Sequence, residues 1–120
     1  MQFKVKSGSS IEKGMHSGTI LALDENERGE KKYKYIDIII KVDGTDFEIK
    51  YGCPSPKGTI NPKSKLGKLL KLWVNLEEAE KTGQDLNLET ILLGKKISFM
   101  TIDKEGFAEV VEDSIEQAKA

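Results

Sequence analysis

The stretch YKYIDIIIKVDGTDFEIKY, residues 33–51, decides the fold class of this chain. Within Tyr33–Val42 every second position from residue 36 onward is aliphatic, and these positions are Ile36, Ile38, Ile40 and Val42. Successive side chains of a strand point to opposite faces, so this period of two predicts a β-strand with one buried face. Asp43-Gly44 is a favoured two-residue turn, and the alternation resumes in Thr45–Tyr51. The stretch therefore predicts a β-hairpin.

Shorter β patterns lie on both sides of this hairpin. Ser17–Asp24 is rich in β-formers and precedes the hairpin, and the charged stretch Glu25–Lys32 between them is predicted to be a loop. Lys95–Asp103 and Phe107–Glu112 predict a second hairpin near the C-terminus. Gln2–Lys6 could add a short leading strand. The chain thus contains five clear strand patterns.

The helical signals fall between the third and fourth strands. Gly52–Ile60 contains two prolines and two glycines and is predicted to be a loop. Asn61 is then a suitable N-cap, and Pro62 suits the first position of a helix. Leu86–Leu93 predicts a second short helix. Four large apolar residues recur at helical spacing and form one stripe, which we expect to face the core. They are Leu66, Leu69, Leu70 and Trp73.

The order of these elements predicts a mainly β protein. We expect a five-stranded, OB-like β-barrel with a helix, or a helix pair, between strands three and four. An open α+β sheet with a helix on one face is the alternative. The length fits a single domain over 1–120, with a leading segment 1–13, the barrel over 14–112 and a polar tail 113–120 that we expect to fray.

Composition narrows the class of protein further. The single cysteine excludes an internal disulfide, and no apolar run approaches the length of a membrane span. The N-terminus lacks the apolar core of a signal peptide, so we expect a cytoplasmic protein with no membrane partner. Residues 1–72 carry a net charge of +5 and residues 73–120 of −6, an asymmetry that hints at a charged partner.

Residues that could support catalysis are few. His16 is the only histidine and is expected in an exposed turn, while Cys53 has no CxxC partner and is expected in a partly buried loop position. The carboxylates Asp24, Glu25 and Glu27, like those of 77–80, could hold magnesium, but Asp and Glu make up 20 of the 120 residues and cluster freely. We therefore expect no enzymatic activity, no metal and no cofactor.

Aromatic and cationic residues give better support to a binding function. Tyr33, Tyr35 and Lys41 lie on the side of their strand opposite the isoleucines, where exposed rings could stack with bases. The segment 57–71 contains five lysines and no acid, as a surface facing phosphates would. The candidate nucleic-acid-binding residues are Tyr33, Tyr35, Lys34, Lys41, Lys50, Lys57, Lys63, Lys65 and Lys68.

Each of these features has an ordinary structural explanation. Tyrosine is common in strands and can simply cover a barrel edge, and lysines beside an apolar stripe are typical of any surface helix. A protein-interaction or assembly module without a nucleic-acid role is therefore the alternative function. Its basic and acidic halves could pair between copies and form a homo-oligomer.

Two phrases of the sequence resemble known proteins. SKLGKLLKLW (64–73) and LLGKKISFMTIDKEGFAEVVEDSI (92–115) are similar to segments of small phage-type and microbial proteins, and the order of elements resembles OB-fold proteins that bind single-stranded nucleic acid. The resemblance implies handling of single-stranded DNA by the face with Tyr33, Tyr35, Lys41 and Lys50. The tail EDSIEQAKA departs from these binders, because it lacks their acidic-hydrophobic ending that recruits partner proteins.

Overall fold

The computed structural model describes residues 14–118. The predicted strand Gln2–Lys6 therefore lies outside the described residues. The strands are β1 (Gly14–Arg28), β2 (Tyr33–Val42), β3 (Glu48–Pro54), β4 (Lys96–Lys104), β5 (Phe107–Val110) and β6 (Glu116–Gln117). The helices are α1 (Lys65–Leu70), α2 (Leu76–Thr82), α3 (Leu88–Leu92) and a 3₁₀ turn, η1 (Glu112–Ser114).

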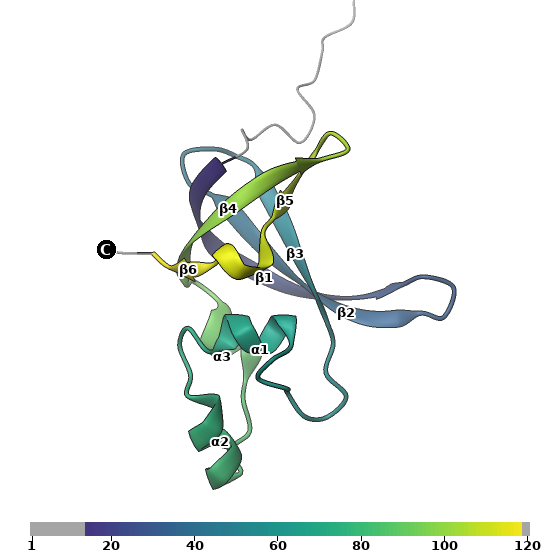
Figure 1. The fold of residues 1–120 in the computed structure, drawn as a ribbon, viewed down its shortest axis with the longest axis vertical. Coiled ribbons are helices and arrows are strands. Elements are labelled where there is room, and N and C mark those ends of the chain that lie inside the picture. The colour runs from purple at the N-terminus through teal and green to yellow at the C-terminus, as the bar shows by residue number, and fades with distance from the viewer. Residues whose placement is uncertain (1–13, 119–120) are drawn as a thin grey trace, which may run out of the picture.

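The strands form one antiparallel sheet in the order β3-β2-β1-β4-β5 (Figure 1). β1 pairs along one edge of β4. β5 and β6 both pair with the other edge, β5 near the C-terminal end of β4 and β6 near its N-terminal end. The sheet is strongly curved, and β3 and β5 approach each other without pairing in the described residues. The prediction of a mainly β fold is confirmed, whereas the closed barrel stays a prediction.

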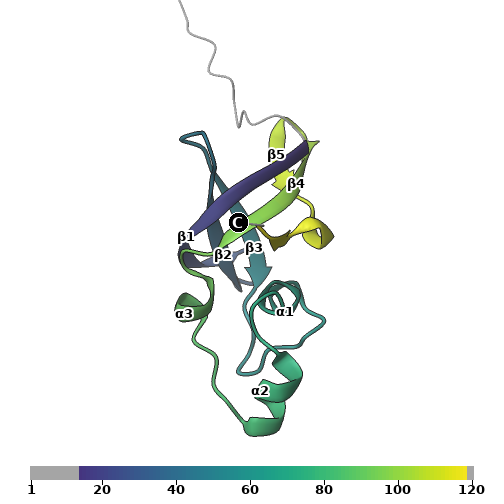
Figure 2. The ribbon, with the colours of Figure 1, turned by 90° about the vertical axis from the view of Figure 1, so that its left-hand side faces the viewer.

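The core forms on the aliphatic side of β2, as the alternation predicts. Ile38 and Ile40 are fully buried, and Ile36 and Val42 nearly so. Their main partners from the other strands and from the helices are Ile20, Ile49, Tyr51, Cys53, Ile97, Phe99, Leu66, Leu70 and Leu92. Helices α1, α2 and α3 gather at one end of the sheet in two perpendicular views, and not over one of its faces (Figures 1 and 2).

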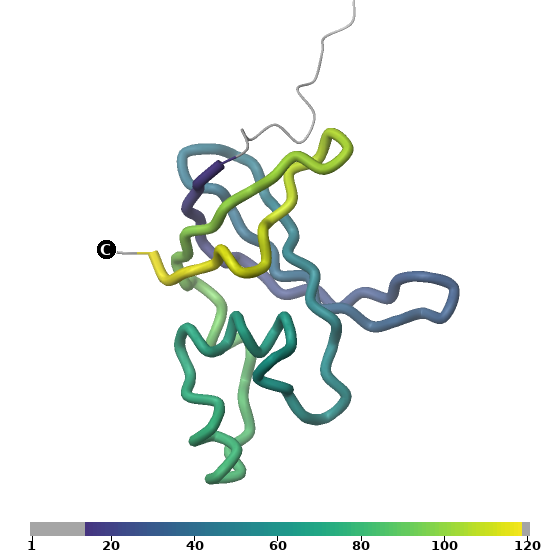
Figure 3. The backbone as a smooth tube through the Cα atoms, in the orientation of Figure 1, coloured from purple at the N-terminus to yellow at the C-terminus, as the bar shows by residue number. Residues whose placement is uncertain are grey.

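The first strand is much longer than predicted. β1 continues through the charged stretch 25–28, which was expected to be a loop, and only Gly29–Lys32 form the turn. A bulge between Ile20 and Ala22 shifts the register of β1 on β2. Residues 25–36 form a two-stranded arm, hereafter the β-arm, that projects from the body of the molecule (Figure 3). Charged residues are tolerated there because those of the projecting part face water.

The connection between β2 and β3 also differs from the prediction. The Val42 N–H donates to the Phe47 carbonyl at 2.9 Å, so the loop has four residues, Asp43–Asp46, and not the two of a tight Asp-Gly turn. β3 begins later and ends later than expected, at Pro54. Cys53 therefore lies in a strand and not in a loop, and its side chain is fully buried.

The helices begin at side-chain caps, though not always at the predicted ones. Ser64 caps α1, since its Oγ accepts from the Gly67 N–H at 3.0 Å, whereas the predicted cap Asn61 stabilises the turn before it. Helix α2 was not predicted, and its acidic sequence begins at the cap Asn75. Asn87 caps α3 as expected, with its Oδ1 accepting from the Thr90 N–H.

The polar tail is ordered as far as residue 118, which contradicts the expected fraying. The Ser114 Oγ accepts from the Met100 N–H at 2.9 Å. The Ala118 N–H donates to the Lys96 carbonyl at 3.0 Å. Backbone and hydroxyl hydrogen bonds to β4 therefore hold a segment whose side chains are mostly polar, and polarity alone did not reveal this.

Gly67→Ala should destabilise the protein. A Cβ at position 67 would lie 2.1 Å from the Asn61 carbonyl oxygen, so the turn before α1 would have to move. Helix propensity alone predicts the opposite sign, a gain of about 1 kcal/mol. We expect a net loss of about 1–3 kcal/mol, as for other overpacked sites, in the free energy of unfolding measured with urea. Lys71→Ala, at the exposed end of α1, is the control, and a stabilised Gly67→Ala variant would contradict this packing.

Candidate functional site

The outward side of β1, β2 and β3 is the candidate site, and we call it the tyrosine face. The register of the three strands assigns residues to it, because directly opposed residues share a face. It consists of Thr19, Ala22, Asp24, Asn26, Arg28, Tyr33, Tyr35, Asp37, Ile39, Lys41, Glu48, Lys50, Gly52 and Pro54.

Asp37 is buried although it belongs to this outward face. Its side chain is 2% exposed, and two neighbours on β1 cover it. The Asn26 Nδ2 donates to Oδ2 at 2.6 Å, and the Arg28 Nη2 donates to Oδ1 at 2.6 Å. Both carboxylate oxygens are thus satisfied, as a buried charge requires.

The same arginine lies over an aromatic ring. The guanidinium carbon of Arg28 is 5.1 Å from the centroid of the Tyr35 ring, in the range of a cation–π contact. Gly52 leaves the room for this arrangement, because a Cβ there would lie 3.0 Å from the Arg28 Nη1 and 3.1 Å from the Asp37 Oδ1. We call Asn26, Arg28, Tyr35 and Asp37 the arginine platform.

Several of the predicted residues share the tyrosine face with this platform. Tyr33 is 60% exposed on the β-arm and is the cross-strand neighbour of Arg28. Lys41 and Lys50 are exposed on the same face, opposite Glu48 and Ile39 respectively. One exposed ring, that of Tyr33, and two exposed ammonium groups therefore share this outward face, as the alternation predicted, and their role in binding stays a prediction.

Lys34 lies on the other side of the β-arm. It alternates with Tyr33 and Tyr35 along β2, and its cross-strand neighbour is Glu27. Glu25 shares that side of the arm, opposite Ile36. The β-arm is thus two-faced, with aromatic rings and Arg28 on one side and two glutamates with Lys34 on the other.

The four candidate lysines of the segment 57–71 fall into two groups, two that are exposed in a loop and two that make contacts within the fold. Lys57 and Lys63 are exposed in the loop that runs from the end of β3 to α1 (Figure 1). The Lys65 Nζ lies 4.2 Å from the ring centroid of Tyr51, which is on the core side of β3. The Lys68 Nζ pairs with the Asp113 Oδ1 at 3.2 Å. These last two lysines therefore serve contacts of α1 within the fold.

A cleft of about 200 Å³ lies beside α1 and has a mixed lining. Its charged groups include two lysines and two acids, so it favours neither an anion nor a cation. Burial raises the pKa of the Tyr51 hydroxyl well above its usual value, so this phenol stays protonated. The lining residues are Tyr51, Lys68, Leu69, Lys71, Glu112, Asp113 and Ile115.

The residues considered for catalysis and metal binding lie on different elements, with His16 in β1, Cys53 in β3 and the acids of 77–80 in α2. His16 lies half-buried in β1, and not in an exposed turn, with its ring centroid 6.1 Å from that of Phe99. Within residues 14–118, no three His, Cys, Asp or Glu side chains gather where they could hold a metal ion. The tyrosine face remains the candidate site.

Arg28 is the main site residue that sequence reasoning missed. It lies in ENERGEKK, which reads as a loop because of its charge and its central glycine. A usable signal was present, since Asn26 and Arg28 have the spacing of one strand face. Extending the first strand through them would have placed both beside Tyr33 and Tyr35.

The chain matches no protein-family model and no curated protein. Across residues 14–118 no helix is long and apolar enough to span a membrane. A proposal about function therefore depends on the geometry of the tyrosine face.

Asp37→Ala should destabilise the fold by about 2 kcal/mol, because it removes charged hydrogen bonds that hold Asn26 and Arg28. Asp24→Ala is the matched control. Asp24 is exposed, opposes Asp37 across the strand pair and has no ion pair within residues 14–118. Removing a like charge should leave stability unchanged or slightly raised. Equal losses in both variants, measured by urea denaturation, would contradict the role of Asp37.

Cys53 should be inert in the native protein. Burial raises the pKa of its thiol to about 12, and the nearby Lys65 ammonium only partly offsets this. The reactive thiolate is therefore scarce at about pH 8, near the usual thiol pKa. Ellman's reagent should react slowly with the folded protein and rapidly in denaturing guanidinium chloride. Fast reaction without denaturant would show that this part of β3 opens.

Proposed function

We propose that this protein is a non-enzymatic binder of single-stranded nucleic acid, and that the tyrosine face is its binding surface. The observation that carries the proposal is the two-sidedness of the β-arm. Tyr33, Tyr35 and Arg28 lie on one side, and the glutamates at 25 and 27 lie on the other. The first side presents aromatic rings and a guanidinium to a base, whereas the second side carries two acids beside Lys34 and repels a polyanion.

The chemistry of the face suits unpaired bases. An exposed ring such as that of Tyr33 can stack with a base of any sequence, which contributes about 1–3 kcal/mol per base. Lys41 and Lys50 follow along the same face, and their ammonium groups can pair with successive phosphates. Lys57 and Lys63 could extend this path along the loop after β3.

The proposal leaves out three of the residues that the sequence suggested. Lys34 is on the acidic side of the β-arm, Lys65 covers the Tyr51 ring, and Lys68 is paired with an aspartate. The binding residues of the proposal are Arg28, Tyr33, Tyr35, Lys41 and Lys50, with Lys57 and Lys63 at the margin.

The proposal includes the architecture of an OB-type barrel. The strand order β3-β2-β1-β4-β5 supports it, since closure needs only β3 and β5 to meet, and these two strands approach each other. We take DNA as the first ligand to test, because residues 64–73 and 92–115 resemble phage-type proteins.

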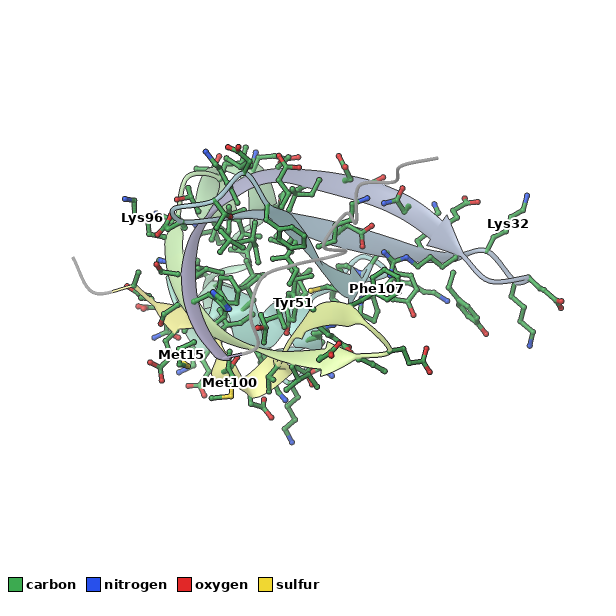
Figure 4. All side chains as sticks on the ribbon, turned by 90° about the horizontal axis from the view of Figure 1, so that it is seen from above. Met15, Lys32, Tyr51, Lys96, Met100 and Phe107 are labelled. Atoms are coloured by element: carbon green, nitrogen blue, oxygen red, sulfur yellow. The ribbon has the colours of Figure 1, made fainter. Side chains whose placement is uncertain are left out.

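A protein-interaction module is the second candidate function, and one observation favours it. Met15 and Met100 are exposed cross-strand neighbours, and Ile102 continues the same outer side of β4. Exposed apolar groups of this kind often mark contacts with other proteins. Seen from above, the two methionines lie on the opposite side of the molecule from the β-arm tip with Lys32, so a partner there would leave the arm free (Figure 4).

The test measures binding of a single-stranded DNA of about 20 nucleotides, longer than an OB-type site, by fluorescence anisotropy. Tyr33→Ala should weaken binding about tenfold without changing stability, because this ring is exposed. Lys50→Ala should make the negative slope of log K against log salt shallower by about 0.7, the loss of one phosphate contact.

Lys34→Ala is the matched control for Lys50→Ala, since it removes the same charge from the other side of the hairpin. It should leave both affinity and salt slope unchanged. The proposed face would be refuted if the unmodified protein did not bind this DNA. It would also be refuted if Lys34→Ala weakened binding as much as Lys50→Ala does.

A further inference from the structure

One face of the Tyr35 ring is not free to stack with a base. Tyr35 is half-buried, and the guanidinium of Arg28 lies over it at 5.1 Å from the ring centroid. A base approaching the tyrosine face from that side therefore meets the guanidinium first. Guanidinium groups are planar and can themselves stack against a base.

The guanidinium is also held in place from several directions. Asp37 accepts from its Nη2 at 2.6 Å, Tyr35 lies beneath it, and Gly52 leaves its Nη1 room close to the backbone of β3. The side chain of Arg28 is nevertheless 49% exposed. An ordered and half-exposed guanidinium is suited to contact with a flat ligand, because little side-chain entropy is lost on binding.

Stability of the fold does not require a charged pair at this position. A buried ion pair often contributes no more than apolar residues of the same volume, since desolvation offsets the Coulomb attraction. Asp37 occupies a position between Tyr35 and Ile39 that an aliphatic residue could fill. Orienting the Arg28 guanidinium would explain why this position carries a buried carboxylate.

We propose that Arg28 is the stacking surface for an unpaired nucleobase, with Asp37 and Gly52 as positioning residues. The inference rests on the proposed function and deepens it, because it specifies an unpaired base, and not only a phosphate, as the group recognised at the arginine platform. Tyr33, the cross-strand neighbour of Arg28, provides a second stacking surface, an aromatic ring, for the next base. The bases of a duplex are already stacked and cannot reach this plane.

The experiment separates stacking from charge. Oligothymidylate and an abasic strand of equal length carry the same phosphates, and only the first has bases. Affinities for both are measured at one low salt concentration for the unmodified chain, Arg28→Lys, Gly52→Ala and the control Lys34→Ala. Circular dichroism checks that each variant is folded, and Gly52→Ala keeps every charge should Arg28→Lys fail to fold.

The unmodified protein should bind oligothymidylate more tightly than the abasic strand. Arg28→Lys keeps the charge but loses the plane, so it should weaken binding of oligothymidylate about tenfold and leave the abasic strand unaffected. Gly52→Ala should give a smaller loss of the same kind, because its Cβ displaces the guanidinium. Lys34→Ala should change neither affinity.

Three other results would overturn the inference. Equal binding of both strands by the unmodified protein would mean phosphate contacts without stacking. An equal loss for both strands in Arg28→Lys would make Arg28 a phosphate contact only, and no loss for either would exclude it from the site. Failure of the unmodified protein to bind either strand would instead refute the proposed function itself.

Discussion

The burial of one side of β2 is the constraint on which the rest of the structure depends. Ile36, Ile38, Ile40 and Val42 are almost inaccessible, and burying each such side chain stabilises the fold by about 1.5–3 kcal/mol. A shift of the pairing by one residue would expose all four and turn Tyr35 inward. The same interaction that forms the core thus determines which side chains reach the outside, including those of the tyrosine face.

Elements whose signal is local could be predicted from the sequence. The strand Tyr33–Val42 was predicted with the bounds that the structure shows, because its alternation can be recognised without information about distant residues. The cap Asn87 and the buried leucines of the apolar stripe were predictable for the same reason, since an N-cap bond and a helical period span only a few positions. The predicted placement of Tyr33, Lys41 and Lys50 on one outward face follows from the alternation as well.

Features that depend on distant partners could not be predicted in this way. Asp37 reads as an exposed strand residue, and its burial requires Asn26 and Arg28 on a strand that was expected to end before them. The tail reads as frayed, and its order comes from hydrogen bonds to β4, such as that between Ser114 and Met100. In each case a polar group is satisfied by a residue that the local pattern does not identify.

The charge of the tyrosine face limits how it could hold a nucleic acid. Arg28, Lys41 and Lys50 are balanced on that face by three acids, which are Asp24, Asp37 and Glu48. Counterion release from a surface without net positive charge contributes little, in contrast to proteins that neutralise many phosphates. Most of the affinity of such a face would therefore come from stacking. Stacking needs ordered planes, and the pair of Asp37 with Arg28 uses a negative charge on the binding face to order one of them.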